Sequence, residues 1–206
     1  MIEAFPKANY QREIPQEQSG ALVWLKRLHL QLDAETFAND AVYLAGGCIR
    51  DSVHGVLYKD VDVVILCDGG NWFGDYIESY IERYCRKVGL TVKADYIGYG
   101  EDYGLRGLVR VCSTEHNATG MKVDLLFYGC NNVQEVLDGF DFNINQYYLG
   151  TDWREGRVVS RLMYSSNVGP EQKLAQVRTT EEGTLRWADR LSRMQQKARE
   201  FGWEVL

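Results

Sequence analysis

The sequence lacks several features that define large classes of proteins. It has only three prolines in 206 residues, no internal repeat and no low-complexity tract, while 45% of its residues are hydrophobic and 25% are charged. These proportions are typical of an ordinary globular protein and exclude collagen-like, coiled-coil and disordered chains. No apolar run approaches the roughly 18 residues of a membrane span, and no apolar leader begins the chain. We therefore expect a cytoplasmic protein without a membrane partner.

Cysteine is sparse, and positive charge is sparse in the first three quarters of the chain. The five cysteines include no CxxC pair, which argues for free, buried thiols in a reducing compartment and against a disulfide framework or a zinc site. Residues 1–153 have a net charge of −9 and residues 154–206 one of +3, which together give −6. The acidic part suits a metal ion, and the basic tail suits phosphate.

Hydrophobic periodicity predicts helices and strands in a mixed order. Helical spacing covers 20–32, 72–88 and 184–201. Short apolar runs rich in β-branched residues predict strands at 41–45, 61–66, 91–97, 107–112, 121–128, 146–149 and 157–163. The simplest division is an N-terminal arm over 1–18, one domain over 19–165 and a helical extension over 166–206.

The segment 44–64 combines acids with a glycine pair. Asp60 and Asp62 are two residues apart in an apolar run, so on a strand both carboxylates project from one face, and their repulsion favours a hard divalent cation such as Mg²⁺. Asp124 interrupts another β-like run and is the candidate for a third carboxylate. Each feature alone also occurs on many solvated strands and turns, and it is their combination that favours a functional site.

Candidate phosphate-binding groups lie next to these acids in the sequence. Gly46 and Gly47 end the first predicted strand, where glycines let backbone amides approach an anion closely. Arg50 and Lys59 can neutralise phosphate, and Asp51 can hold the arginine in place. A metal site beside a phosphate-binding turn suggests a nucleoside triphosphate.

These motifs resemble those of a known family. GGCIRDSVHG at 46–55 followed by KDVDVV at 59–64 resembles the signature of the polymerase-β-like nucleotidyltransferases, in the group of poly(A) polymerase and the CCA-adding tRNA nucleotidyltransferases. DFNIN, from Asp141 to Asn145, resembles the family's second motif, DFT-x-N, which contacts the sugar and base of the nucleotide. The resemblance covers residues 20 to 165 well and the remainder poorly.

The resemblance implies a fold, a set of site residues and a reaction. The fold would be an α+β catalytic head with a mixed, largely antiparallel sheet flanked by helices. The metal ions, Mg²⁺ or Mn²⁺, would bind Asp60, Asp62 and Asp124, and the expected substrate is ATP or CTP. The nucleotide would be bound by Gly46, Gly47, Arg50, Asp51, Lys59, Asp141 and Asn145. An acceptor hydroxyl would attack the α-phosphate and release pyrophosphate.

The sequence also departs from the family pattern. Gly139 and Phe140 stand where paired arginines are usual, and Asn143 stands in place of threonine. The acceptor stays open: it is tRNA or another RNA 3′ end, or else a small molecule or protein. Acceptor RNA would contact a basic stripe on the last helix, formed by Arg186, Arg190, Arg193 and Lys197. The alternative is a non-catalytic nucleotide sensor that binds a protein partner through that helix.

Overall fold

The computed structural model describes residues 20–35, 41–67, 75–97, 107–154, 156–169, 171–177 and 185–205. The helices are α1 (Gly20–Ala34), α2 (Gly47–Val53), α3 (Asp75–Lys87), α5 (Val133–Leu137) and α6 (Leu185–Glu200), with a short 3-10 helix η1 (Asn143–Asn145). The strands are β1 (Ala41–Ala45), β2 (Asp60–Leu66), β3 (Leu90–Ile97), β4 (Leu108–His116), β5 (Lys122–Tyr128), β6 (Tyr147–Arg154) and β7 (Arg157–Tyr164).

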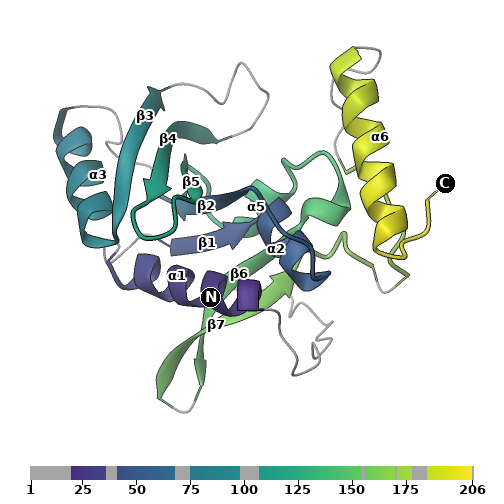
Figure 1. The fold of residues 1–206 in the computed structure, drawn as a ribbon, viewed down its shortest axis with the longest axis horizontal. Coiled ribbons are helices and arrows are strands. Elements are labelled where there is room, and N and C mark those ends of the chain that lie inside the picture. The colour runs from purple at the N-terminus through teal and green to yellow at the C-terminus, as the bar shows by residue number, and fades with distance from the viewer. Residues whose placement is uncertain are drawn as a thin grey trace, which may run out of the picture.

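The seven strands form one mixed sheet in the order β3-β4-β5-β2-β1-β6-β7 (Figure 1). Five of the neighbouring pairs are antiparallel, and β2 with β5 is the parallel pair. Short turns join β4 to β5 and β6 to β7, as antiparallel hairpins allow, whereas a parallel pair needs a long crossover. The chain between β2 and β5 contains α3, β3 and β4. The predicted α+β class with a largely antiparallel sheet is confirmed.

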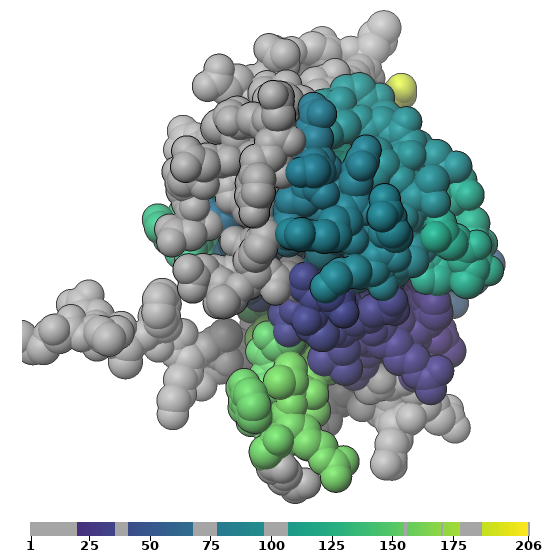
Figure 2. Space-filling model, turned by 90° about the vertical axis from the view of Figure 1, so that its left-hand side faces the viewer, coloured from purple at the N-terminus to yellow at the C-terminus, as the bar shows by residue number. Residues whose placement is uncertain are grey.

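Helices α1 and α3 cover one face of the sheet. Leu22, Leu25, Leu28 and Leu32 follow helical spacing along α1 and are all buried against the strands. Figure 2 shows α1 and α3 next to each other on this side, and the Tyr84 hydroxyl of α3 donates a hydrogen bond to the Leu32 carbonyl oxygen at 3.0 Å. These contacts fix the main hydrophobic core on the helix side of the sheet.

The opposite face carries a smaller core under α5. Val136 and Leu137 of α5 pack with Val64 and Leu66, which are at the C-terminal end of β2. The N-terminal end of β2 extends beyond this cluster. Because the strand alternates, its polar residues there lie on the same face as Val64 and Leu66.

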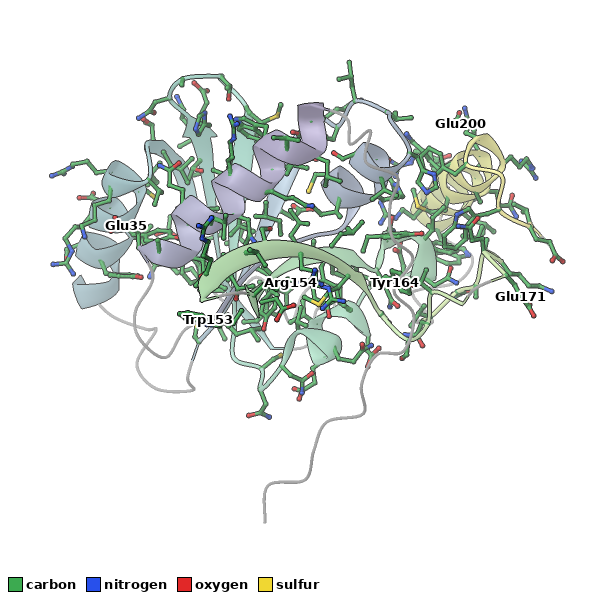
Figure 3. All side chains as sticks on the ribbon, turned by 90° about the horizontal axis from the view of Figure 1, so that it is seen from below. Glu35, Trp153, Arg154, Tyr164, Glu171 and Glu200 are labelled. Carbon is green, nitrogen blue, oxygen red and sulfur yellow. The ribbon has the colours of Figure 1, made fainter. Side chains whose placement is uncertain are left out.

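Strands β6 and β7 extend into a long hairpin that projects from the rest of the molecule (Figure 1). Trp153 and Arg154 lie near its tip, while Tyr164 lies at the other end, toward α6 (Figure 3). Trp153 is 72% exposed. About halfway along β7 the hairpin is tied to α1 through the buried His29, whose ring nitrogens contact the Ser160 hydroxyl and the Val42 carbonyl oxygen of β1.

Most predicted elements are present, with differences at their ends. Helix α5 was not predicted, and β4 runs four residues beyond the predicted end at Cys112. The predicted arm and residues 72–74 of the second predicted helix lie outside the described residues, and the division at residue 165 stays a prediction. No helix in the described ranges has the length and apolar character needed to cross a membrane.

Candidate active site

Strand β2 carries Asp60 and Asp62 on the face opposite α1 and α3. Val61 and Val63, which alternate with them, are buried in the main core, so the two acids point away from it. Asp60 is exposed at the start of the strand, and Asp62 is partly buried between its neighbouring strands. The two carboxylates thus share one face, as their spacing predicts.

Asp124 lies directly beside Asp62. In the parallel pairing of β2 and β5, Asp62 is opposite Asp124 and Asp60 is opposite Lys122. On its other side Asp124 is opposite Ser113 of β4. The register therefore gathers three acids, one lysine and one serine on a single face of three adjacent strands.

Burial and like charge both act on Asp62. They raise the pKa of its carboxyl to about 7, with burial as the largest cause, followed by the charges of Asp60 and Asp124. The ordinary aspartate pKa is about 3.9, so in the absence of a cation this carboxyl is only about half ionised at neutral pH. A cation at this position would favour the ionised form.

The three acids do not yet form a closed metal site. Among the described residues, no three His, Cys, Asp or Glu side chains are arranged to hold a metal ion. Both oxygens of Asp124 have partners: Oδ1 accepts a hydrogen bond from the Ser113 hydroxyl, and Oδ2 accepts one from the Lys122 ammonium at 2.6 Å. The hydrogen bond from Lys122 to Asp124 also raises the pKa of Lys122.

Carboxylate oxygens on adjacent strands are nonetheless suitable donors for Mg²⁺ or Mn²⁺. The three acids therefore fit such an ion in their chemistry and in their register on adjacent strands.

Gly46 and Gly47 join β1 to α2 next to the acids. Gly46 has a φ of +79°, which favours glycine, and a Cβ built on it would lie 3.4 Å from Asp62 Oδ2 and 3.7 Å from the Phe140 ring. A Cβ on Gly47 would lie 3.5 Å from Arg50 Nη2. The glycine pair therefore brings main chain close to both an acid of β2 and the guanidinium of α2.

Arg50 is almost fully buried, where a guanidinium needs partners. Its Nε donates a hydrogen bond to Asp51 Oδ1 at 2.7 Å, and its Nη1 donates to Asn145 Oδ1. Asp51 thus holds the arginine in place, as its position in the sequence predicts. Unlike Arg50, Lys59 is exposed, just before β2. Its role in binding phosphate stays a prediction.

The second motif is linked to this network through η1. Asn145 Nδ2 donates to Asp141 Oδ1 at 3.2 Å, so Asn145 connects Arg50 to Asp141. Asp141 also accepts two hydrogen bonds from the Arg190 guanidinium of α6, at 2.5 and 3.1 Å. The two motifs are therefore connected through three side chains, and the hydrogen bond that joins them links residues 95 positions apart in the chain.

The basic stripe of α6 is only partly available to a ligand. Besides Arg190, Lys197 is engaged with the head, since its ammonium is 3.6 Å from Asp51 Oδ1. Arg193 is exposed. Arg186 belongs to α6, but its side chain lies outside what the structure describes. An acceptor-binding role for these four residues stays a prediction.

The apolar side of α6 packs on the chain's own head. Trp187 stacks on Phe142 with ring centroids 5.4 Å apart, and Met194 and Ala198 are buried. Met194 Sδ is 3.9 Å from Arg50 Nη1. Because this side is already covered, a partner-binding surface on α6 is not supported.

Two features of the site could not be assigned from sequence patterns alone. Asn143, the departure from threonine, is buried and has a structural role, donating to the carbonyl oxygens of Asn167 and Lys173 and accepting from the Ala175 amide. The contacts of Ser113 and Lys122 with Asp124 were also missed. Their signal was the alternation of Lys122 and Asp124 on one strand, which places both side chains on the same face.

Comparisons with known proteins identify the fold. No protein-family model matches the sequence, and no curated protein matches it either. Among solved structures, the CCA-adding enzyme of Thermotoga maritima complexed with tRNA is similar, with a TM-score of 0.54 and 18% identity over 92% of this chain and 40% of that one.

Two further solved structures are similar to this chain to the same degree. An apo CCA-adding enzyme has a TM-score of 0.52 and 18% identity over 91% of this chain and 40% of its own. An apo tRNA-processing enzyme has a TM-score of 0.54 and 16% identity over 96% and 46%. The chain therefore shares the fold of the matching part of these enzymes. The particular structures that it resembles are tRNA-processing enzymes, and the chain spans less than half of their length.

Proposed function

We propose that the chain is a metal-dependent nucleotidyltransferase that moves a nucleoside monophosphate from ATP or CTP to an acceptor hydroxyl. The observation that carries the proposal is the register of β2 and β5, which sets Asp62 opposite Asp124 with Asp60 on the same face. The similarity of the fold to CCA-adding enzymes, one of them in complex with tRNA, supports this class of reaction.

Each group of residues in the site would have its own role in the reaction. The acceptor oxygen forms a bond to the α-phosphorus, the bond to the β-phosphate oxygen breaks, and pyrophosphate leaves. Gly46 and Gly47 leave room for phosphate next to Asp62, and Arg50 supplies positive charge. A divalent cation bound by the three acids would lower the pKa of the acceptor hydroxyl and offset charge on the leaving group. Asp141 and Asn145 would orient the nucleoside.

For the acceptor we propose an RNA 3′ end, tRNA first among them. The exposed Arg193 and the similarity to tRNA-processing enzymes favour RNA. The second candidate is a small molecule or a protein hydroxyl. It is favoured by the ion pairs of Arg190 and Lys197, which occupy part of the basic stripe. We place the reaction in the cytoplasm, and the five cysteines, all of them free thiols, support a reducing compartment.

The test is transfer of label from each α-³²P-labelled nucleoside triphosphate, with Mg²⁺ or Mn²⁺, to a pool of small RNA and cell extract. The parent is compared with Asp62→Asn and with the control Asp152→Asn. The control removes a carboxylate from the same sheet, on the projecting hairpin, where Asp152 pairs with Arg161 at 3.0 Å.

We expect the parent and the control to transfer label and Asp62→Asn to lose at least a hundredfold in rate. Label on RNA supports the RNA acceptor, whereas label on protein or a small molecule supports the second candidate. If Asp62→Asn is as active as the parent, the site assignment is wrong. If the parent binds nucleotide tightly without any transfer, the chain is a nucleotide sensor instead.

A further inference from the structure

Strand β5 places a lysine among the acids of the site. Lys122 and Asp124 are two residues apart and share a face, as Asp60 and Asp62 do on β2. The parallel register puts Lys122 opposite Asp60 and Asp124 opposite Asp62. The result is a two-by-two array of three carboxylates and one ammonium, in which the lysine belongs to the same strand as the third acid.

Within this array Lys122 pairs with Asp124. Its ammonium is 2.6 Å from Asp124 Oδ2, and the side chains of Lys122 and Asp124 are 54% and 13% exposed. Ser113 donates to the other oxygen of the same carboxylate. Both oxygens of Asp124 therefore have a hydrogen-bond partner, and a cation that approaches this carboxylate has to compete with the lysine.

We propose that Lys122 is a built-in counter-ion that neutralises Asp124 until a divalent cation takes its place. The inference rests on the proposed function, because the cation concerned is the one expected at the three acids. Lys122 is then a positioning residue: it acts on the cation through Asp124. Its presence makes Asp124 the last of the three carboxylates to engage the cation and lowers the affinity of the site.

The surroundings allow the lysine to move away. Lys122 and Asp124 are at one end of a groove of about 420 Å³ on the open face of β3, β4 and β5. The other walls of this groove are mostly apolar and include Tyr96, Val111 and Leu126. An ammonium that leaves Asp124 has both this groove and open solvent to enter.

Electrostatics predicts how removal of the Lys122 ammonium changes the affinity of the site for a divalent cation. An ammonium close to Asp124 repels an approaching divalent ion and also competes for its ligand, so removing the ammonium should tighten cation binding. At a site with partial solvent access the change should be on the order of tenfold in Kd.

The test measures cation binding without nucleotide. Mn²⁺ is titrated into the full chain, and the free ion is followed by electron paramagnetic resonance. The variants are Lys122→Met, Lys122→Gln and the control Lys87→Met. Lys87 also forms an ion pair, with Glu35 at 2.9 Å, but on the helix side of the sheet. We expect the Kd for Mn²⁺ to fall about tenfold in both Lys122 variants and to stay unchanged in the control.

An unchanged or higher Kd in both Lys122 variants overturns the inference. The variant Asp62→Asn separates this failure from failure of the proposed function. If Mn²⁺ binds Asp62→Asn as tightly as the parent, the three acids are not the cation site. If binding depends on Asp62 but the Lys122 variants are no tighter than the parent, only the role of Lys122 is wrong. Lys122→Arg, which keeps the charge, should bind Mn²⁺ like the parent.

Discussion

The replacement Asp62→Asn should stabilise the metal-free protein. The pKa of this carboxyl is raised to about 7 in the folded chain, mainly by burial and then by the charges of Asp60 and Asp124. In the unfolded chain the pKa is about 3.9. Below pH 4 the group is protonated in both states and contributes nothing. Between pH 4 and 7 the unfolded chain ionises first, so stability falls as the pH rises, and the full cost persists above pH 7.

The size of the effect follows from the shift. A change of about three pKa units corresponds to about 4 kcal/mol. Asp62 keeps some contact with solvent, which screens part of the repulsion, so we expect about 2 kcal/mol. Asparagine has a similar shape without the charge. The variant should therefore be more stable than the parent by about 2 kcal/mol at pH 8 and by less than about 1 kcal/mol at pH 5.

Urea unfolding followed by tryptophan fluorescence, in the presence of EDTA, measures this difference. Addition of Mg²⁺ should stabilise the parent and narrow the gap, because only the parent keeps all three carboxylates. A variant that is no more stable than the parent at pH 8, or a gap that is equally large at pH 5, would refute the explanation by burial and like charge.

Two more substitutions test the framework around the site. Asp95→Asn should destabilise the protein by about 2 kcal/mol in the same urea assay, because Asp95 is the partner of the buried Arg110 guanidinium. An unchanged urea midpoint would mean that this ion pair contributes nothing to the stability of the fold. Gly46→Ala should lower the free energy of unfolding by about 1 kcal/mol, because the backbone at position 46 has a positive φ that favours glycine. It should also weaken ATP binding severalfold in calorimetry, because the added methyl group lies next to Asp62, and unaltered ATP binding would remove Gly46 from the nucleotide site.

Much of the fold could be predicted from local patterns. The leucines of α1 and the apolar runs of β1 and β2 follow regular periods, and the elements found there end within two residues of the predictions. Helix α5 was missed because it has only five residues, too few to show a period. Its stability depends instead on the Asn132 side chain, which accepts a hydrogen bond from the Glu135 amide, and on burial of Val136 and Leu137.

The candidate site shows where sequence reasoning stops. That Asp60 and Asp62 share a face follows from the period of a strand, and Asp124 was suspected because it interrupts an apolar run. The pairing of Asp62 with Asp124 and the contact of Arg190 with Asp141 are different. The first depends on strand register and the second on how α6 packs against the head, and both are set by long-range packing that no local pattern encodes.

The parallel pairing of β2 with β5 has a consequence for how the chain folds. Hairpins such as β4–β5 close locally and early, whereas β2 and β5 meet only after the chain between them has been ordered. Asp62 and Asp124 are therefore expected to be apart during the early stages of folding, and their repulsion acts only when β2 pairs with β5. The acids of the proposed site oppose the step that brings them together, so we expect a divalent cation to accelerate refolding.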